Sequence, residues 1–215
     1  MILAIDTTSE FGSLALMHGE TQVDELPLHS PDGFAHVLFE HLERLLDRNE
    51  ARLGDVECFA AAAGPGSFTG VRVGLAAAKG LAEAAGRPAI AVSNLKALAS
   101  FGSRALRVPL IDARRGQVYA AIYNEDLQIV VPEAVIALPV WIAGLPEGDL
   151  EFIATDFAPF QPALSGGTFT GAPRALASAV ARIAWREWQG GEARDAAGLD
   201  ANYVRRSDAE LFWKE

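Results

Sequence analysis

The first residues that could do chemistry are Asp6, Thr7 and Thr8, which directly follow the apolar run 2–5. At the end of a strand, a carboxylate can hold a magnesium ion through its oxygens, while hydroxyl and backbone N–H groups face a phosphate. The same residue types also close a β-hairpin through an Asx or Thr turn. The motif alone leaves both interpretations open.

A second strand–Asp–turn–Gly–strand segment follows the first at a spacing of roughly a hundred residues, which predicts an internal duplication. Actin-like ATPases and sugar kinases use a first loop of the Asp6 type, and their second loop needs adjacent glycines so that the backbone can approach phosphate. Here Arg114 and Arg115 precede a single glycine, Gly116. We therefore expect a vestigial nucleotide loop made of Asp6, Thr7, Thr8 and Asp112.

The glycine-rich turn 64–70 lacks the spacing of three better-known motifs. It has no Gly-Lys-Ser/Thr end for a Walker loop, no third glycine three residues after Gly66 for a dinucleotide fingerprint, and no glycines two residues either side of Ser67 for a hydrolase elbow. We interpret it as a structural strand-to-helix turn, with Ser67 or Thr69 capping the helix. Its residues are Gly64, Gly66, Ser67 and Thr69.

Other candidate ligands are few. His36 and His41 are five residues apart, which places them on different helix faces, so we predict no metal site. Cys58 is the only cysteine and lies in an apolar stretch, which favours a buried, inert thiol. The loop 165–168 has the composition of an adenosine-binding segment but stands isolated, and we interpret it as a plain loop.

The elements that must position these residues alternate between strands and helices. We expect strands near 2–5, 12–17, 21–28, 56–63, 89–92, 109–112, 118–122, 129–136 and 152–154, and helices near 33–48 (with Asp32 as a cap), 70–86, 94–101, 141 and 173–188. The echo of the first strands in the second half predicts two α/β lobes. We place the first at residues 1–103 and a smaller, divergent one at 104–215.

Composition restricts the class of partner. The chain of 215 residues carries a formal charge of −10 and has no basic stripe, so we do not expect it to hold nucleic acid by itself. No run approaches the roughly 18 apolar residues of a membrane span, and no signal peptide is recognisable. We therefore expect a soluble, cytoplasmic protein that does not bind membranes.

Two expected helices have more apolar perimeter than one sheet face requires. In the helix after residue 70, the charges fall on a strip about 40° wide, and in the helix before residue 48 the apolar arc spans roughly 200°. Packing within the chain could absorb this surface; the alternative is a helix-on-helix interface with a partner. The residues expected in that interface are Phe34, Val37, Leu38, His41, Leu45, Gly70, Arg72, Gly74, Ala77, Ala78 and Leu81.

Three segments together resemble a known family. They read Ala-Ile-Asp-Thr-Thr at 4–8, Gly-Pro-Gly-Ser-Phe-Thr-Gly-Val-Arg-Val-Gly at 64–74, and Ile-Asp-Ala-Arg-Arg-Gly-Gln-Val-Tyr at 111–119. In this order and spacing they are similar to the TsaB family, also called YeaZ. The resemblance is strong over roughly 1–125 and thin over 132–190, and Ala201 stands where the family usually has proline.

The resemblance implies an actin-like, ribonuclease H-like duplicated α/β fold of the ASKHA superfamily, each lobe a mixed sheet with helices. It implies a non-catalytic subunit of the complex that makes threonylcarbamoyladenosine in tRNA. The partners would be the catalytic paralogue TsaD, through the first-lobe helices, and the ATPase TsaE, with a homodimer when TsaD is absent and tRNA bound only through the complex. The resemblance implies no cofactor of its own, apart from ATP or ADP shared at a complex interface.

The alternative hypothesis is a stand-alone actin-like ATPase or small-molecule kinase. Tight Mg-ATP binding that is lost in Asp6→Ala would favour it. A peptidase, suggested by the name glycoprotease that such chains often carry, is disfavoured because no nucleophile constellation is found. Under the subunit hypothesis we expect Gly74→Trp to block pairing with TsaD while the isolated chain stays folded.

Overall fold

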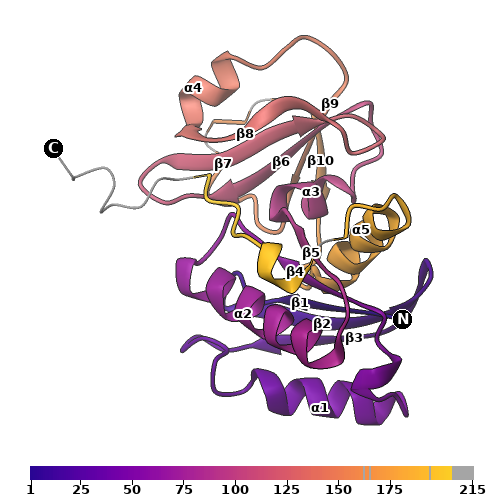
Figure 1. Ribbon diagram of the computed structural model, residues 1–215. Helices are drawn as coiled ribbons and strands as arrows, with labels where there is room; N and C mark the ends of the chain where they lie inside the picture. Colours follow the sequence, from indigo (N-terminus) through magenta and orange to yellow (C-terminus); the bar gives the residue numbers. More distant parts are fainter. Residues whose placement is uncertain (162, 165, 194, 205–215) are drawn as a thin grey trace, which may run out of the picture. The chain divides into compact units, whose positions relative to one another are not determined.

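The computed structural model describes residues 1–161, 163–164, 166–193 and 195–204, which divide into two compact units (Figure 1). The first unit comprises residues 1–97 and 173–201, and the second comprises residues 98–172 with residues 202–204. No helix in the described part of the chain has the length and apolar character needed to cross a membrane. Ser165, at the start of the predicted plain loop, lies outside the described residues.

The first unit contains a five-stranded sheet in the order β3-β2-β1-β4-β5. Its strands are β1 (Ile2–Asp6), β2 (Phe11–His18), β3 (Thr21–His29), β4 (Cys58–Ala62) and β5 (Ala89–Val92). β1 runs antiparallel to β2 and parallel to β4, so β1 and β4 lie inside the sheet. Both strands are buried along their whole length, which explains their nearly continuous apolar sequences.

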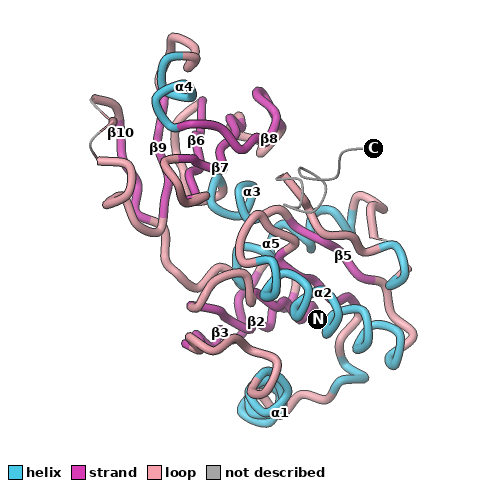
Figure 2. Tube along the Cα trace, turned by 90° about the vertical axis from the view of Figure 1, so that its left-hand side faces the viewer, coloured by secondary structure: helices cyan, strands magenta, loops and turns pink. Residues whose placement is uncertain are grey.

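Helices α1 (Leu38–Arg48) and α2 (Phe68–Ala85) pack on one face of this sheet. Leu42 of α1, Leu75 of α2 and Leu3 of β1 belong to the same buried cluster. Helix α5 (Ala177–Gln189) contacts β1, β2, β4 and β5. Figure 2 shows α1 beside β2 and β3, which it contacts. The remaining helical segments of this unit are α3 (Asn94–Ala99), which reaches into the second unit, and the short 3-10 helices η1 (Leu53–Asp55) and η2 (Ala196–Gly198).

Three helix boundaries test the predictions for where helices begin and end. Ser67 is the N-cap of α2, and its hydroxyl accepts a hydrogen bond from the Gly70 N–H at 3.3 Å, as predicted. The predicted end at Gly86 is also confirmed, because Gly86 is the C-cap with a φ of 61°. The predicted start of α1 near residue 33 is wrong: residues 34–37 form a bend and turns, and the N-cap is Val37, without a side-chain cap.

The second unit repeats the topology of the first. Its strands are β6 (Leu106–Asp112), β7 (Gln117–Tyr123), β8 (Ile129–Ala137), β9 (Leu150–Ala154) and β10 (Thr168–Gly171), in the order β10-β9-β6-β7-β8. β6 is antiparallel to β7 and parallel to β9, as β1 is to β2 and β4. The short helix α4 (Leu138–Ala143) follows β8. The predicted fold class, two mixed sheets with helices in a duplicated arrangement, is confirmed.

The last helix belongs to the first unit, although the predicted lobe boundary placed it in the second. Its first turn is held by the first sheet, because Ser13 accepts a hydrogen bond from the Ala177 N–H and Glu25 accepts one from the Ser178 N–H, both at 2.9 Å. These two side chains replace the N-cap side chain that α5 lacks. The chain therefore returns to its first sheet after completing the second.

Candidate functional site

Asp6 lies at the end of β1 and is buried, with 1% of its surface exposed. Its Oδ1 accepts hydrogen bonds from the Thr8 N–H at 3.0 Å and from the Thr8 hydroxyl at 2.6 Å. Burial raises the pKa of the Asp6 carboxyl above its ordinary value, and the hydrogen bonds from Thr8 oppose that shift. The predicted vestigial loop therefore directs its carboxylate into the protein, towards its own threonine.

The glycine-rich turn closes over this loop. The Ser67 N–H donates to the Thr8 carbonyl oxygen at 2.6 Å, and the Thr7 hydroxyl donates to the Gly70 carbonyl oxygen at 2.7 Å. A Cβ atom on Gly66 would lie 2.5 Å from the Thr8 oxygen, and one on Gly70 would lie 1.9 Å from the Thr7 oxygen. The two glycines thus allow backbone to meet backbone where the nucleotide hypothesis would place a phosphate.

Asn94, at the start of α3, completes this polar cluster and was not expected from the sequence. Its side-chain N–H donates to the Thr8 hydroxyl at 2.6 Å, and its Oδ1 accepts from the Gly64 N–H at 2.8 Å. Asn94 is 2% exposed, so these hydrogen bonds satisfy a buried amide. The available signal was the polar pair Ser93-Asn94 directly after strand 89–92. The cluster joins the ends of β1, β4 and β5.

Asp112, the predicted counterpart in the second unit, forms its own closed turn. Its carboxylate accepts from the Arg114 N–H at 2.8 Å and lies 3.4 Å from the Arg114 guanidinium. Arg114, Arg115 and Gly116 have φ values of 64°, 55° and 73°, so two arginines occupy a backbone region that favours glycine. Among the described residues, no group of three or more His, Cys, Asp or Glu side chains is placed to hold a metal ion.

Most of the residues predicted for the helix interface face the interior of the first unit. Phe34, Leu38, Leu45, Gly70, Gly74, Ala77 and Ala78 are buried. The physical reason on α2 is the proximity of β1: a Cβ on Gly74 would lie 2.6 Å from the Thr7 hydroxyl oxygen. The small residues admit the protein's own chain at Ile5 and Thr7, so we now expect Gly74→Trp to disturb the packing of α2 on β1 rather than to leave the fold intact. Val37, His41 and Leu81 are half-buried, and Arg72 is exposed.

The predicted excess of apolar surface on α1 is also largely absorbed within the chain. Leu42 is buried, and the half-buried Leu46 packs against the same core. The outward positions of α1 are mainly charged, and Phe39, which is 58% exposed, is the large apolar exception. The expected partner interface on α1 is therefore corrected. Packing within the chain, the alternative that the sequence left open, covers most of the apolar face of this helix.

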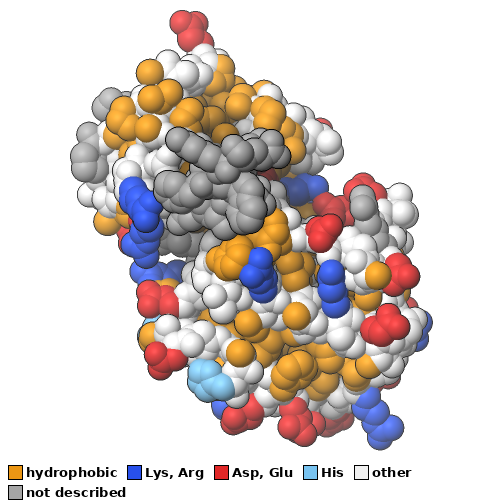
Figure 3. Space-filling model, turned by 60° about the vertical axis from the view of Figure 1, so that its left-hand side comes forward, with side chains coloured by type: hydrophobic (Ala, Val, Ile, Leu, Met, Phe, Trp, Pro, Cys, Tyr) orange, Lys and Arg blue, Asp and Glu red, His pale blue; other side chains and the backbone are white. Residues whose placement is uncertain are grey.

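The outward face of α2 is different. It presents small apolar positions one helical turn apart: Ala76, Gly80 and Ala84 are exposed, and Val73 is half-buried. At its N-terminal end, the Arg72 guanidinium carbon lies 3.6 Å from the centroid of the Phe68 ring, which is 49% exposed. Figure 3 shows hydrophobic side chains spread over the first unit in this view, with a few Lys and Arg side chains among them. This surface was missed because the glycine face of α2 was expected to meet the partner.

Comparisons with known proteins agree with this architecture. The family model TsaD, described as tRNA N6-adenosine threonylcarbamoyltransferase, matches residues 26–185. The tRNA threonylcarbamoyladenosine biosynthesis protein TsaB of Bacillus subtilis is 32% identical over 225 aligned positions, covering 100% of this chain and 98% of the relative. The solved structure of YeaZ from Pseudomonas aeruginosa is 26% identical, with a TM-score of 0.81 over 94% of this chain and 98% of that chain.

A more distant structure shares the fold alone. Component A of the (R)-2-hydroxyglutaryl-CoA dehydratase of Acidaminococcus fermentans is 10% identical, with a TM-score of 0.54 over 86% of this chain and 98% of that chain. Two copies of one five-stranded unit, with helices packed on the first sheet, define an actin-like α/β fold of the ASKHA class. Within that class, the full-length similarity is decisive. The chain belongs to the TsaB family, also called YeaZ.

Proposed function

We propose that this chain is the non-catalytic subunit of a tRNA threonylcarbamoyladenosine synthesis complex, in which it binds and supports a TsaD-type transferase. The observation that carries the proposal is the alignment with the B. subtilis TsaB protein over the whole length of both chains. A TsaE-type ATPase is the third component of the proposed complex, which would act in the cytoplasm.

The closed Asp6 loop supports the non-catalytic role. The Asp6 Oδ1 is occupied by two hydrogen bonds from Thr8, and backbone atoms of Gly66 and Gly70 lie against the loop. The hydroxyl of Ser67, the serine of the glycine-rich turn, accepts a hydrogen bond from the Gly70 N–H and so serves as a helix cap. Each of these groups has a structural role, and none of these contacts favours the kinase or peptidase alternatives.

The outward face of α2 supports the partner role. Small side chains at Ala76, Gly80 and Ala84 let a second helix approach closely, and a neighbouring aromatic ring adds apolar area. Arg72, which contacts the Phe68 ring, places a positive charge at the N-terminal end of this face. We assign the TsaD-binding surface to this face, and the same face to a homodimer when TsaD is absent.

The charge of the chain supports binding of tRNA through the complex. A net charge of −10 repels a polyanion, and phosphate neutralisation supplies most of the affinity for nucleic acid. We therefore expect the transferase to contribute most of the tRNA contacts. The isolated chain would then show no measurable tRNA binding at physiological salt.

Reconstitution tests the function. With purified TsaD- and TsaE-type proteins of the same cell, ATP, threonine, bicarbonate, the enzyme that makes the threonylcarbamoyl donor, and unmodified tRNA, modification should require this chain. Restoring it should restore the modified nucleoside, which mass spectrometry of digested tRNA detects. Full modification in its absence would refute the role. Asp6→Asn, a near-isosteric change, should support modification as well as the wild type, because the proposed subunit uses no acid at this position.

A further inference from the structure

The chain crosses between its two units at residues 97/98, 172/173 and 201/202. The first crossing is followed by the segment between α3 and β6, and the second comes directly after β10. The first of these connections, and the strand from which the second one leaves, are bonded to a single side chain of the second unit, Glu151 in β9 (Leu150–Ala154). This arrangement links two chain segments that are about seventy residues apart in sequence.

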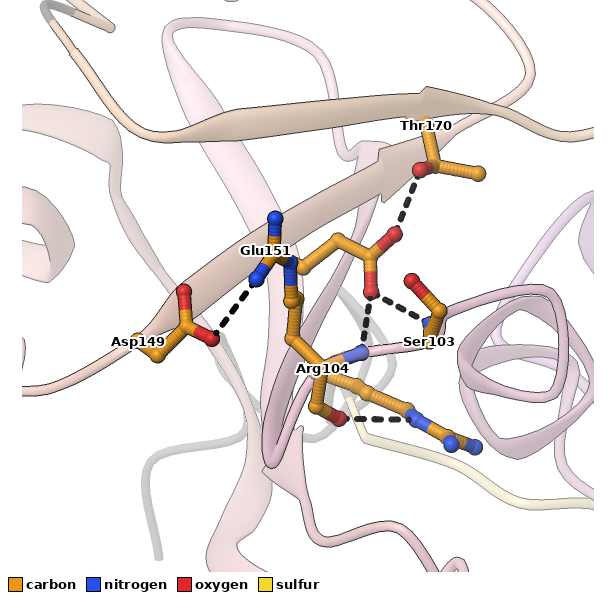
Figure 4. A network of polar contacts seen from close by, with 6 residues as sticks. Ser103, Arg104, Asp149, Glu151 and Thr170 are labelled. Atoms are coloured by element: carbon orange, nitrogen blue, oxygen red, sulfur yellow. Dashed lines mark hydrogen bonds and ion pairs between the residues drawn. The ribbon is translucent and has the colours of Figure 1, made fainter.

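Glu151 is 1% exposed, and both of its carboxylate oxygens are occupied. Oε2 accepts from the Ser103 N–H at 2.6 Å and from the Arg104 N–H at 2.8 Å, while Oε1 accepts from the Thr170 hydroxyl in β10 at 2.5 Å (Figure 4). Figure 4 shows the Glu151 side chain between the Ser103–Arg104 segment and the strand that carries Thr170. The carboxylate therefore bonds to the backbone of one connection and to a side chain at the base of the other.

Arg107, on the adjacent strand β6, also holds the first connection, by donating hydrogen bonds to backbone carbonyl oxygens. Arg107 and Glu151 are register partners in the parallel pair β6/β9. The Arg107 guanidinium donates to the Arg104 carbonyl oxygen at 3.2 Å and to the Ala99 carbonyl oxygen at 3.5 Å. A Cβ on Gly102 would lie 2.9 Å from Glu151 Oε2, so the connection passes very close to the carboxylate.

The electrostatics keep Glu151 ionised. Burial alone would raise the pKa of its carboxyl, but the hydrogen bonds from Thr170, Arg104 and Ser103, together with the charge of Arg107, outweigh burial and place the pKa below its ordinary value. Hydrogen bonds to an ionised acceptor are stronger than those between neutral groups. Because the three donors share one rigid carboxylate, rotating it away from one connection also weakens its bond to the other.

We propose that Glu151 is a conformational anchor that holds both connections to one point of the second sheet, so that they are released together. Motion of one unit on the other must then bend the chain outside these bonds, at the crossings 97/98 and 172/173, and at the third crossing, 201/202. The anchor is independent of the function proposed above, because it concerns only how the two halves of this chain are joined.

Amide hydrogen exchange of the full chain at neutral pH tests the anchor. Removing the acceptor in Glu151→Leu should speed exchange of the Ser103 and Arg104 amides about tenfold or more. It should also speed exchange about threefold or more at the Ala172 amide, which bonds to the Ala154 carbonyl oxygen and does not touch Glu151. Acceleration at Ser103 and Arg104 with unchanged exchange at Ala172 would overturn the proposal.

Two milder variants keep the test decisive if Glu151→Leu does not fold. Glu151→Gln can still accept from the two amides while its NH₂ donates to the Thr170 hydroxyl, so all three amides should exchange within about threefold of the wild type. Thr170→Val removes only the bond to Oε1, and the anchor requires faster exchange at Ser103 and Arg104, which Thr170 does not contact. Wild-type exchange at those two amides in Thr170→Val would contradict it.

Discussion

Replacing Gly70 with alanine should destabilise the protein, although alanine is the better helix former. Gly70 is the third residue of α2, and its Cα faces the Asp6–Thr8 loop. An added Cβ would lie 1.9 Å from the Thr7 carbonyl oxygen and 3.0 Å from the Thr7 carbonyl carbon. These are backbone atoms, so relief requires the helix to move away from β1.

The expected magnitude combines three effects. Overpacking of this kind costs about 1–3 kcal/mol. Moving the helix also strains the hydrogen bond from the Thr7 hydroxyl to the Gly70 carbonyl oxygen, which contributes about 1 kcal/mol. Alanine returns about 0.5–1 kcal/mol through its helix propensity. The free energy of unfolding should therefore fall by about 1–3 kcal/mol.

Gly80→Ala provides the matched control. Gly80 lies in the same helix and is exposed, and a Cβ added to it would meet no neighbouring atom within 4 Å outside the adjacent helix backbone. Its replacement should raise the unfolding free energy by about 0.5–1 kcal/mol. Urea unfolding of the two variants, followed by far-ultraviolet circular dichroism, measures both changes. If Gly70→Ala proves as stable as Gly80→Ala, the packing of α2 against β1 described above is wrong.

Three further predictions concern Asp6, Arg115 and Cys58. Asp6 has a raised pKa in the folded state, so the native protein holds a proton that the unfolded chain releases. The free energy of unfolding of the wild type, relative to that of Asp6→Asn, should therefore fall as the pH rises above the ordinary pKa of 3.8, and it should level off above the pKa of the folded state. Urea unfolding over a range of pH measures this difference, and a difference that does not change with pH would exclude the coupling. Arg115→Asn places an Asn-Gly pair in a turn whose two residues both have positive φ, the conformation that Asn-Gly favours. The free energy of unfolding should rise by about 0.5–1 kcal/mol, which a higher midpoint of thermal unfolding would show. A lower midpoint would mean that the arginine stabilises the turn. Burial raises the pKa of the Cys58 thiol to about 12, so a disulfide reagent at pH 8 should react only in step with unfolding, and rapid labelling of the native chain would contradict the burial.

Local chemistry made the ends of α2 predictable. Ser67 supplies a hydroxyl for the first turn, and Gly86 adopts a left-handed conformation that other residues avoid. The buried strand around Cys58 was also found, because its apolar run has only one plausible environment, the interior of a sheet. In each case, neighbours in sequence determine the structure.

Other elements were missed because distant residues determine them. β10 is four residues long, with alternating half-buried and exposed positions after two glycines, so its sequence resembles a loop. It is a strand because it pairs in parallel with β9. Phe34 and Val37 continue the apolar spacing of α1 towards residue 33, yet their backbone forms a bend and a turn. Periodicity alone does not distinguish these cases.

The glycine face of α2, which the sequence predicts to meet a partner, is filled from within the chain for a similar reason. Gly70 and Gly74 leave space for close approach, and sequence alone does not say whether another molecule or the chain's own strand fills it. The structure places Thr7 there. Asn94 was missed because the sequence did not bring it next to Thr8, from which it is separated by 86 residues.

The outward face of α2 as the site of TsaD binding is the central claim, and Ala76→Arg tests it most directly. Ala76 is exposed in the middle of that face, so arginine should leave the fold intact while obstructing a close helix. Ala158→Arg, at an exposed position in the second unit, is the matched control. Isothermal titration with the TsaD-type protein of the same cell should show binding by the wild type and Ala158→Arg, and at least about tenfold weaker binding by Ala76→Arg. Equal affinity in all three proteins would contradict the assignment.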